Sequence, residues 1–239
     1  MEFDLFKLVR KEMELVEQSL YQHVNTSEQV LSEASTHLIK AGGKRIRPGF
    51  ALLVARMYRD DIGYAIPLAT ALELVHMATL VHDDVIDNSE VRRGTGTVKR
   101  LWGNRVAIYA GNFVFARALD LIASYNRQDI LEVVADASMK ICQGEIEQML
   151  SCFNVNLGLK NYLRRIERKT ALLISLSCQV GAMLSTSNPK EIEALRRYGY
   201  DLGLAFQITD DILDFVADEA TLGKPTGSDI RQGVITLPA

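Results

Sequence analysis

The sequence predicts an all-α protein, a single helical domain over residues 1–239, on three observations. Apolar residues recur with helical spacing along nearly the whole chain, and no segment sustains the alternation that is typical of strands. Only 5 prolines and 16 glycines interrupt the 239 residues, of which 48% are hydrophobic. A chain of this length can bury a sizeable core, and no shift in composition marks a linker between two domains.

The helical segments follow from the positions of the breaks between them. Glycine, proline and polar runs interrupt the pattern at Gly42-Gly43, at 60–63, at 94–96, at Asn188-Pro189 and at 223–233. Several segments are apolar nearly all round, which is typical of central helices in a large bundle. The expected helices are 3–22, 27–41, 45–59, 64–87, 104–124, 128–153, 159–186 and 189–215.

Composition and charge argue against several classes of function. The net charge of -3 gives no general attraction to nucleic acid or to an anionic membrane. The 3 cysteines lack metal-ligand spacing and suit a reducing compartment. The N-terminus alternates charges, and the longest uncharged run, 170–189, is rich in hydroxyl side chains. We therefore expect a cytoplasmic protein with no signal peptide, no transmembrane segment and no nucleic-acid partner.

Two aspartate clusters dominate the sequence. Residues 83–87 read DDVID and residues 210–214 read DDILD, and each cluster follows an apolar run with helical spacing. At about 100° per residue, the first and third carboxylates of each cluster lie about 40° apart on the helical wheel, and His76 and Gln207 fall near the same stripes. The alternative is that the aspartates lie by chance at a solvent-exposed helix end, which is plausible for one cluster but much less so for two. Clustered carboxylates need a counter-charge, and Mg²⁺ is the obvious candidate, because it combines one or two carboxylates with waters and substrate phosphates.

Cations are concentrated near these clusters and in one glycine-rich turn. Residues 42–48 read GGKRIRP, where two glycines allow close approach to an anion and the following helix N-terminus favours negative charge. Lys44 and Arg47 are three residues apart and can share a face. Such a turn is more often simply solvated, but Arg92-Arg93-Gly94 also follows the first cluster closely. Cations beside a carboxylate cluster suggest a polyanionic ligand. Further candidate phosphate donors are Lys169, Thr170 and Lys224.

Together these segments resemble the trans-isoprenyl (polyprenyl) diphosphate synthase family over nearly the whole chain. The matching segments, in family order, are GGKRIRP, ELVHMATLVHDDVID, RRG, GNFVFARAL, QGE, RKTALL, GLAFQITDDILD and LGKPTGSD. The resemblance implies an all-α bundle around a deep central cavity, usually dimeric. It implies a prenyltransferase that joins isopentenyl diphosphate head-to-tail to an allylic diphosphate such as farnesyl diphosphate. Family members continue well beyond the segment TLP, so the last C-terminal helices are expected to be missing after Ala239.

The resemblance also implies a role for each candidate residue. An allylic diphosphate leaves when its developing charge is stabilised, here by about three Mg²⁺ ions, or Mn²⁺ in their place, and by nearby cations. The predicted metal ligands are the six clustered aspartates, Asp83, Asp84, Asp87, Asp210, Asp211 and Asp214, with Asp83 and Asp87 holding two ions and Asp210 the third. The predicted allylic-diphosphate ligands are Arg92, Lys169 and Lys224. The predicted isopentenyl-diphosphate ligands are Lys44, Arg47, His76 and Arg93. Thr170 and Gln207 would steady the carbocation. Without the resemblance, His76 would be interpreted as a satisfied core histidine.

Two features bear on product length and on partners. Short-chain members carry aromatic residues four or five positions before the first aspartate motif, where this chain has Thr79 and Ala78. On the wheel Thr79 lies about 40° and Val75 about 80° from Asp83, so both can border the growing chain, whereas Ala78, at about 140°, is implicated by resemblance alone. With no bulky stop, products of about C30–C40 are expected. Val234 replaces a lysine found in many members, a variant that fits the large subunit of two-component heptaprenyl diphosphate synthases.

Other interpretations of the motifs stay open at this point. A class I terpene cyclase shares the first motif, but its second metal motif usually differs and it lacks a metal-free diphosphate site. A non-catalytic subunit of a heteromeric synthase usually loses aspartates or cations, and this chain keeps both. We therefore expect a synthase that acts as a homodimer or as a heterodimer with a small regulatory subunit.

Overall fold

The structure is a computed structural model that describes residues 5–216, 227–231 and 233–237. The chain divides into two compact units, one formed by Met1–Leu131 with Val180–Ser187 and the other by Glu132–Gln179 with Asn188–Ala239. Within the described residues, strand structure is limited to the antiparallel pair β1 (Val91–Arg92) and β2 (Thr95–Gly96). The all-α prediction is therefore confirmed, while the assignment of residues 1–239 to a single domain stays a prediction.

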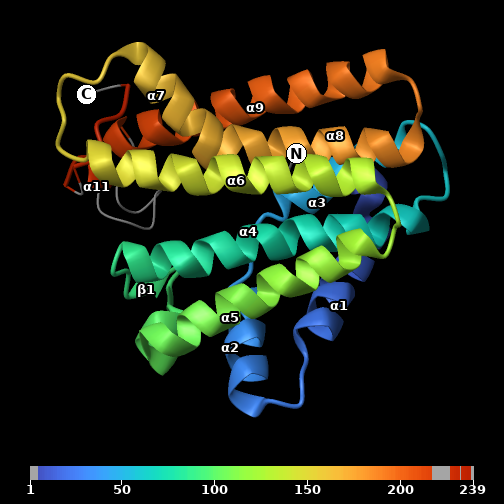
Figure 1. Cartoon of the computed structure of the whole chain (residues 1–239), viewed down its shortest axis with the longest axis horizontal. Coiled ribbons are helices and arrows are strands. Elements are labelled where there is room, and N and C mark those ends of the chain that lie inside the picture. Colours follow the sequence, from blue (N-terminus) through green and yellow to red (C-terminus); the bar gives the residue numbers. More distant parts are fainter. Residues whose placement is uncertain (1–4, 217–226, 232, 238–239) are drawn as a thin grey trace. The chain divides into compact units, whose positions relative to one another are not determined.

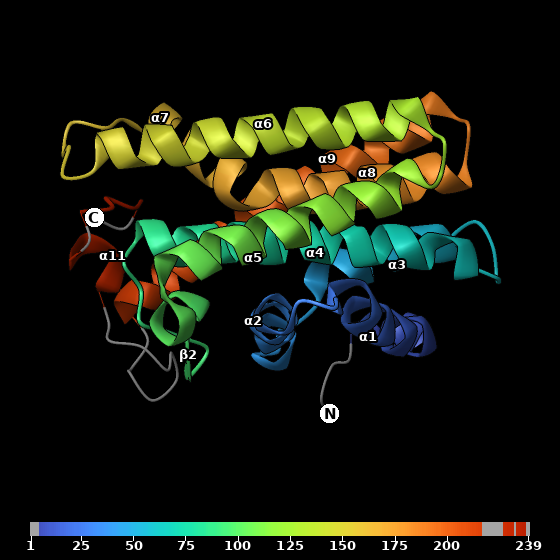
Figure 2. The ribbon, with the colours of Figure 1, turned by 60° about the horizontal axis from the view of Figure 1, so that its bottom comes forward.

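The first unit is organised around one apolar helix. Its helices are α1 (Arg10–Val24), α2 (Gln29–Lys40), α3 (Ile46–Arg56), α4 (Ile66–Ile86) and α5 (Val98–Ala123), with short 3-10 turns at Lys7–Val9 and Gly63–Ala65. Helix α4 is buried along most of its length, and α1, α3 and α5 all pack against it. Figures 1 and 2 both show α4 and α5 running side by side. The approach is close at Gly111, where an added Cβ would lie 2.4 Å from His82 Nε2.

Helix α5 begins earlier than the sequence pattern indicates. Thr97 caps its first turn by accepting a hydrogen bond from the backbone N–H of Arg100, at 3.2 Å. The helix is then interrupted at Gly103, which has φ 83° and ψ 165°. This conformation is strained for any residue with a side chain, so glycine permits the kink. The expected start at residue 104 therefore marks the kink, and the turn before it was missed.

The second unit is also helical in the residues that the structure describes. It contains most of α6 (Gln128–Ser151) and α8 (Leu172–Ser185), together with α7 (Leu159–Ile166), a π-helical segment η3 (Glu167–Ala171), α9 (Pro189–Val216) and α11 (Ser228–Arg231). The single helix expected over 159–186 is thus divided by a π turn. Helix α9 lies along η3 and α8 (Figure 1), and at Gly203 an added Cβ would be 2.5 Å from Ala171 Cα. Glycine therefore allows these helices to pack closely.

Two helices are long and apolar enough to cross a membrane by length and composition alone. They are Gly63–Ile86 and Val98–Ala123, each with a mean hydropathy of 1.5 in its most apolar window. That window is 67% buried in the first helix and 39% buried in the second. A helix in the core of a protein is apolar on all sides, so the burial of Gly63–Ile86 explains its hydropathy without a membrane. The absence of a transmembrane segment stays a prediction.

Candidate active site

The first aspartate cluster lies at the C-terminal end of α4. Asp87 forms the C-cap, and its backbone N–H donates to the carbonyl of Asp83 at 2.8 Å. Asp84 is only 3% exposed and accepts a hydrogen bond from Arg92 Nε at 2.7 Å. Burial raises the pKa of Asp84, and the charge of Arg92 opposes that rise. Asp83 is half-buried and Asp87 exposed, so the three carboxylates of one motif occupy three different environments.

Arg92 and Arg93 are held near this helix end by the small hairpin of β1 and β2. Arg93 and Gly94 form its turn, with φ values of 53° and 77°. On α2, His37 Nε2 lies 2.6 Å from the carbonyl oxygen of Gly96 and fixes the second strand. Asp84, Arg92 and Arg93 line one pocket together. The hairpin was not expected from the sequence, because two-residue strands are too short to show an alternating pattern.

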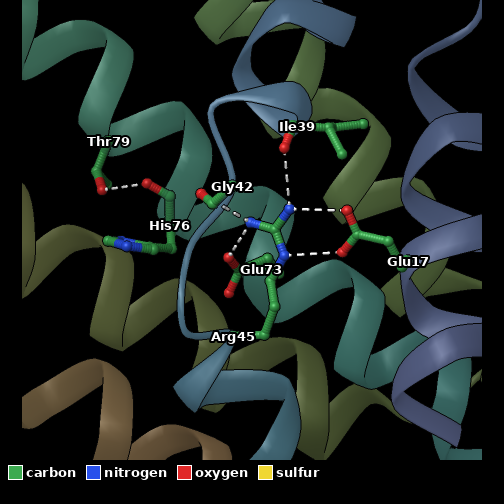
Figure 3. Close-up of polar contacts among 7 residues, drawn as sticks. All are labelled: Glu17, Ile39, Gly42, Arg45, Glu73, His76 and Thr79. Atoms are coloured by element: carbon green, nitrogen blue, oxygen red, sulfur yellow. Dashed lines mark hydrogen bonds and ion pairs between the residues drawn. The ribbon is translucent and has the colours of Figure 1, made fainter. Parts of the chain in front are cut away.

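The cations of the glycine-rich basic loop differ in burial and in their partners. Arg45 has φ 46° and ψ 41° immediately before α3, and its side chain is only 9% exposed. Figure 3 shows its guanidinium enclosed by acceptors: Glu17 takes two bonds at 2.9 and 3.0 Å, and Glu73 takes one at 3.0 Å. Arg45 is therefore an internal anchor that joins the loop to α1 and α4. Lys44 is exposed, and Arg47 is half-buried.

The structure gathers Arg47, His76 and Arg93 into one cationic cluster. Gly43 has φ 151°, and an added Cβ would lie 2.4 Å from Arg93 Nη1, so this glycine makes room for the guanidinium. Burial lowers the pKa of Arg47 to about 10, with a smaller contribution from Arg93. Burial, and then the charges of Arg47 and Arg93, hold the pKa of His76 well below its usual value. His76 is therefore neutral at neutral pH and can act as a hydrogen-bonding group.

The second aspartate cluster lies near the end of α9 and has partners of another kind. Asp210 is exposed, whereas Asp211 and Asp214 are 3% and 0% exposed. Asp211 accepts hydrogen bonds from the Tyr162 hydroxyl at 2.8 Å and from Gln207 Nε2 at 2.9 Å. Burial and the neighbouring carboxylate of Asp211 raise the pKa of Tyr162, so the hydroxyl keeps its proton.

A neutral network extends from this cluster to the π-helical segment. Thr170 Oγ1 donates to Gln207 Oε1 at 2.5 Å, which links η3 to α9. Lys169 and Thr170 both lie in η3, with Lys169 exposed and Thr170 buried. Single π turns within α-helices occur frequently at functional sites. Sequence reasoning identified Thr170 and Gln207 but missed Tyr162, Arg45, Glu17 and Glu73.

The remaining candidate residues are those predicted to control product length, together with Val234 and Lys224. Val75 and Ala78 are each 1% exposed within α4. Thr79 is half-buried, and its hydroxyl donates to the carbonyl of His76 at 2.8 Å (Figure 3). Val234 is half-buried. Lys224 lies outside the described residues.

The donor chemistry of the clusters fits Mg²⁺. Within the part of the chain that the structure describes, no three His, Cys, Asp or Glu side chains converge as a metal site. Mg²⁺ does not require such a cage, because it takes one or two carboxylates together with waters and substrate phosphates. The carboxylates that fit this role in the first cluster are those of Asp83 and Asp87, which lie one turn apart. Asp210 is the exposed carboxylate of the second.

Comparisons with known proteins agree on one family. Residues 28–239 match the family model described as polyprenyl synthetase. A heptaprenyl diphosphate synthase component 2 from Geobacillus stearothermophilus is 46% identical over 234 residues, which are 98% of this chain and 73% of that protein.

Solved structures lead to the same family. Heptaprenyl diphosphate synthase from Staphylococcus aureus superposes with a TM-score of 0.92 at 41% identity, over 100% of this chain and 74% of that one. A polyprenyl synthase from Caulobacter crescentus CB15, complexed with calcium and isoprenyl diphosphate, also gives 0.92, at 39% identity over 98% of this chain and 71% of that one.

Proposed function

The chain belongs to the polyprenyl synthetase family, and on that premise we propose that it is a trans-prenyltransferase that makes a long-chain polyprenyl diphosphate. It condenses isopentenyl diphosphate with an allylic diphosphate such as farnesyl diphosphate. The observation that carries the proposal is the pair of DDxxD clusters, each at the end of a helix, accompanied by a cationic cluster built around Arg47 and Arg93.

The residues divide between the two substrates. Arg92, beside Asp84, is suited to the allylic diphosphate, together with the exposed Lys169. Lys224 completes this set, although it lies outside the described residues. The exposed Lys44 and the cluster of Arg47, His76 and Arg93 are suited to isopentenyl diphosphate without metal. Guanidinium groups match diphosphate oxygens well, because they can donate two parallel charged hydrogen bonds.

The reaction needs stabilisation of a leaving group and of a carbocation. The allylic C–O bond breaks and diphosphate leaves with the electron pair. The double bond of isopentenyl diphosphate then attacks the allylic carbon, and a proton passes to the released diphosphate. The dipoles of Thr170 and Gln207, already joined by a 2.5 Å hydrogen bond, steady the positive charge.

Mg²⁺ is the proposed cofactor, with about three ions by family resemblance and Mn²⁺ as an alternative. Asp83, Asp87 and Asp210 would hold it, with Asp84, Asp211 and Asp214 completing the two clusters. When bound, it supplies Lewis-acid stabilisation of the departing diphosphate. The Caulobacter relative, complexed with calcium and isoprenyl diphosphate, supports binding of a divalent cation by this fold.

Products of about C30–C40 are proposed, with heptaprenyl diphosphate as one example within that range. Two relatives, from Geobacillus and Staphylococcus, are named heptaprenyl diphosphate synthases. In this chain the two positions where short-chain members carry aromatic stops hold Ala78 and Thr79. Small side chains there leave the path of the growing product open.

A second subunit is part of the proposal. The Geobacillus relative is a component 2, a name that implies another component in that enzyme. We therefore propose a heterodimer with a small regulatory subunit, with a homodimer as the alternative. Cytoplasmic localisation remains a prediction from composition.

An assay with labelled isopentenyl diphosphate, farnesyl diphosphate and Mg²⁺ tests the function. Transfer of label into chains of about C30–C40 is the expected result, with the candidate partner subunit supplied. Cyclic hydrocarbon from farnesyl diphosphate alone would indicate a terpene cyclase. If the partner alone transfers the label, and mutation of this chain's aspartates does not lower that activity, this chain is a non-catalytic subunit.

A further inference from the structure

The cationic cluster of the first unit is built around a buried carboxylate that sequence reasoning did not single out. Glu73 lies on α4, one turn before His76, and is 2% exposed. One of its oxygens accepts from Arg45 Nη1 at 3.0 Å (Figure 3). Its other oxygen is buried with no hydrogen-bond partner in the described part of the chain. Burying a carboxylate costs free energy, so the presence of Glu73 among arginines calls for an explanation.

Glu73 differs from the other carboxylate that holds the same arginine. Glu17 binds Arg45 through two bonds, but its side chain is 40% exposed, against 3% for Glu73. Glu73 lines the same pocket as Arg92 and Arg93, and its charge raises the pKa of both Arg47 and Arg93 against the effect of burial. Glu17 has no resolved effect on the pKa of either arginine. One carboxylate therefore anchors Arg45 from the surface, and the other faces the whole cluster.

The arginines need such a counter-charge when no ligand is bound. Arg47 has a buried Nε without a partner in the described residues, and the charge of Arg93 acts against that of Arg47. Gly43 brings the Arg93 guanidinium against the basic loop. Like charges repel, and the repulsion is stronger where burial limits their contact with water, as it does at Arg47. Without an internal anion, the guanidinium groups would separate, and a ligand would have to reassemble them.

We propose that Glu73 is a positioning residue for the metal-free diphosphate site. Its negative charge keeps Arg47 and Arg93 at the spacing needed to receive isopentenyl diphosphate. This effect is separate from the hydrogen bond that Glu73 accepts from Arg45. This role rests on the proposed function of the site. Pre-organised charges raise affinity because the ligand does not have to order them on binding.

The test compares Glu73→Gln with the matched control Glu17→Gln. Each variant removes one carboxylate from Arg45, but only the first removes the charge that acts on Arg47 and Arg93. Binding of isopentenyl diphosphate is measured calorimetrically on the full-length protein with chelator present, and binding of an unreactive thio analogue of farnesyl diphosphate is measured with Mg²⁺. Urea unfolding of each variant reports its structural cost.

Glu73→Gln should weaken isopentenyl diphosphate by about tenfold, the effect of losing one charge-assisted interaction, and change the allylic analogue by less than about twofold. Glu17→Gln should leave both affinities within about twofold even where it lowers stability. Glu73→Asp, which keeps the charge, should restore most of the affinity. Equal effects of the two glutamine variants, or tighter isopentenyl diphosphate binding in Glu73→Gln, would overturn the proposal.

A second comparison applies if Glu73→Gln does not fold. Arg45→Gln and the double variant Arg45→Gln/Glu73→Gln differ only in the Glu73 charge, and the double variant leaves no unpaired member of the buried pair. The same tenfold difference in isopentenyl diphosphate affinity is expected between them, and no difference would overturn the role. If the wild-type protein binds isopentenyl diphosphate but forms no product with any partner, the proposed function is wrong. The affinities of the variants for isopentenyl diphosphate still test the role of Glu73 in that case.

Discussion

The two DDxxD clusters have the same spacing, yet their middle aspartates are stabilised in different ways. Asp84 and Asp211 are each 3% exposed. Asp84 is paired with the charged guanidinium of Arg92, whereas Asp211 accepts hydrogen bonds from two neutral groups, Tyr162 and Gln207. The final aspartates also differ, since Asp87 is exposed and Asp214 fully buried. A shared motif therefore does not imply a shared environment, and the two clusters should respond differently to mutation and salt.

The leading aspartates should be the most sensitive positions in both clusters. Asp83→Ala and Asp210→Ala should each lower kcat by about a thousandfold or more, since each removes a carboxylate that would hold an ion at the leaving group. Asp214→Ala should lower kcat less, because its side chain is buried, and should lower stability more. Steady-state rates at saturating Mg²⁺ check this, and near-normal turnover in Asp83→Ala would contradict the proposed role.

Cations of the basic loop and of the hairpin should separate the two substrates. Lys44→Ala and Arg47→Ala should raise the KM for isopentenyl diphosphate by about tenfold to a hundredfold and leave the allylic substrate nearly unchanged. Arg92→Ala should do the reverse. A charged hydrogen bond is worth about 1.5–3 kcal/mol, which sets this range. If all three variants weaken both substrates equally, the division of sites is wrong.

The partners of the middle aspartates should differ in their response to salt. Tyr162→Phe should destabilise the fold by about 2 kcal/mol, because it removes a buried hydrogen bond to a carboxylate, with little dependence on salt. Arg92→Ala should change stability by less than about 1 kcal/mol, because its side chain is 34% exposed, and the effect should shrink as salt is added. Urea unfolding at low and high ionic strength measures both. A salt-independent Arg92 effect would show that packing, and not the ion pair, dominates.

The cationic cluster should produce an alkaline limit to substrate binding. Arg47 binds diphosphate only while protonated, and burial lowers its pKa to about 10. Affinity for isopentenyl diphosphate should therefore be constant at mildly alkaline pH and fall as pH rises through about 10. Arg47→Ala should bind weakly but lack this limb. Calorimetry across the alkaline range measures it, and a limb that persists in Arg47→Ala would assign the titration to another group.

Product length should change without loss of catalysis. Thr79→Phe places an aromatic ring where the side chain is only half-buried, so it should shorten products toward C15–C20 at a near-normal rate. Ala78→Phe should shorten them too, but Ala78 is 1% exposed, and overpacking should lower stability by about 1–3 kcal/mol. Chromatography of dephosphorylated products reads the outcome. A wild-type enzyme that stops at C20 with its partner present would refute the open path.

Much of the fold was accessible from the sequence, because helical periodicity and glycine or proline breaks are local signals. The helices at 66–86 and 189–216 fall within two residues of the expected 64–87 and 189–215 at each end. The π turn at 167–171 was not, since a five-residue segment is too short for its period to be told from that of an α-helix. The internal role of Arg45 was also missed. The three cations of the basic loop look alike in a sequence, whereas in the structure Arg45 has a left-handed backbone and its side chain is held by Glu17 and Glu73.

The proposal depends most on both aspartate clusters holding divalent ions that serve the allylic diphosphate. The most direct test is a crystal structure of the full-length protein with Mn²⁺ and an unreactive farnesyl diphosphate analogue, with the ions located by anomalous scattering. We expect ions on Asp83 and Asp87 in the first cluster and on Asp210 in the second. Ions confined to one cluster, or a diphosphate bound away from both, would contradict it.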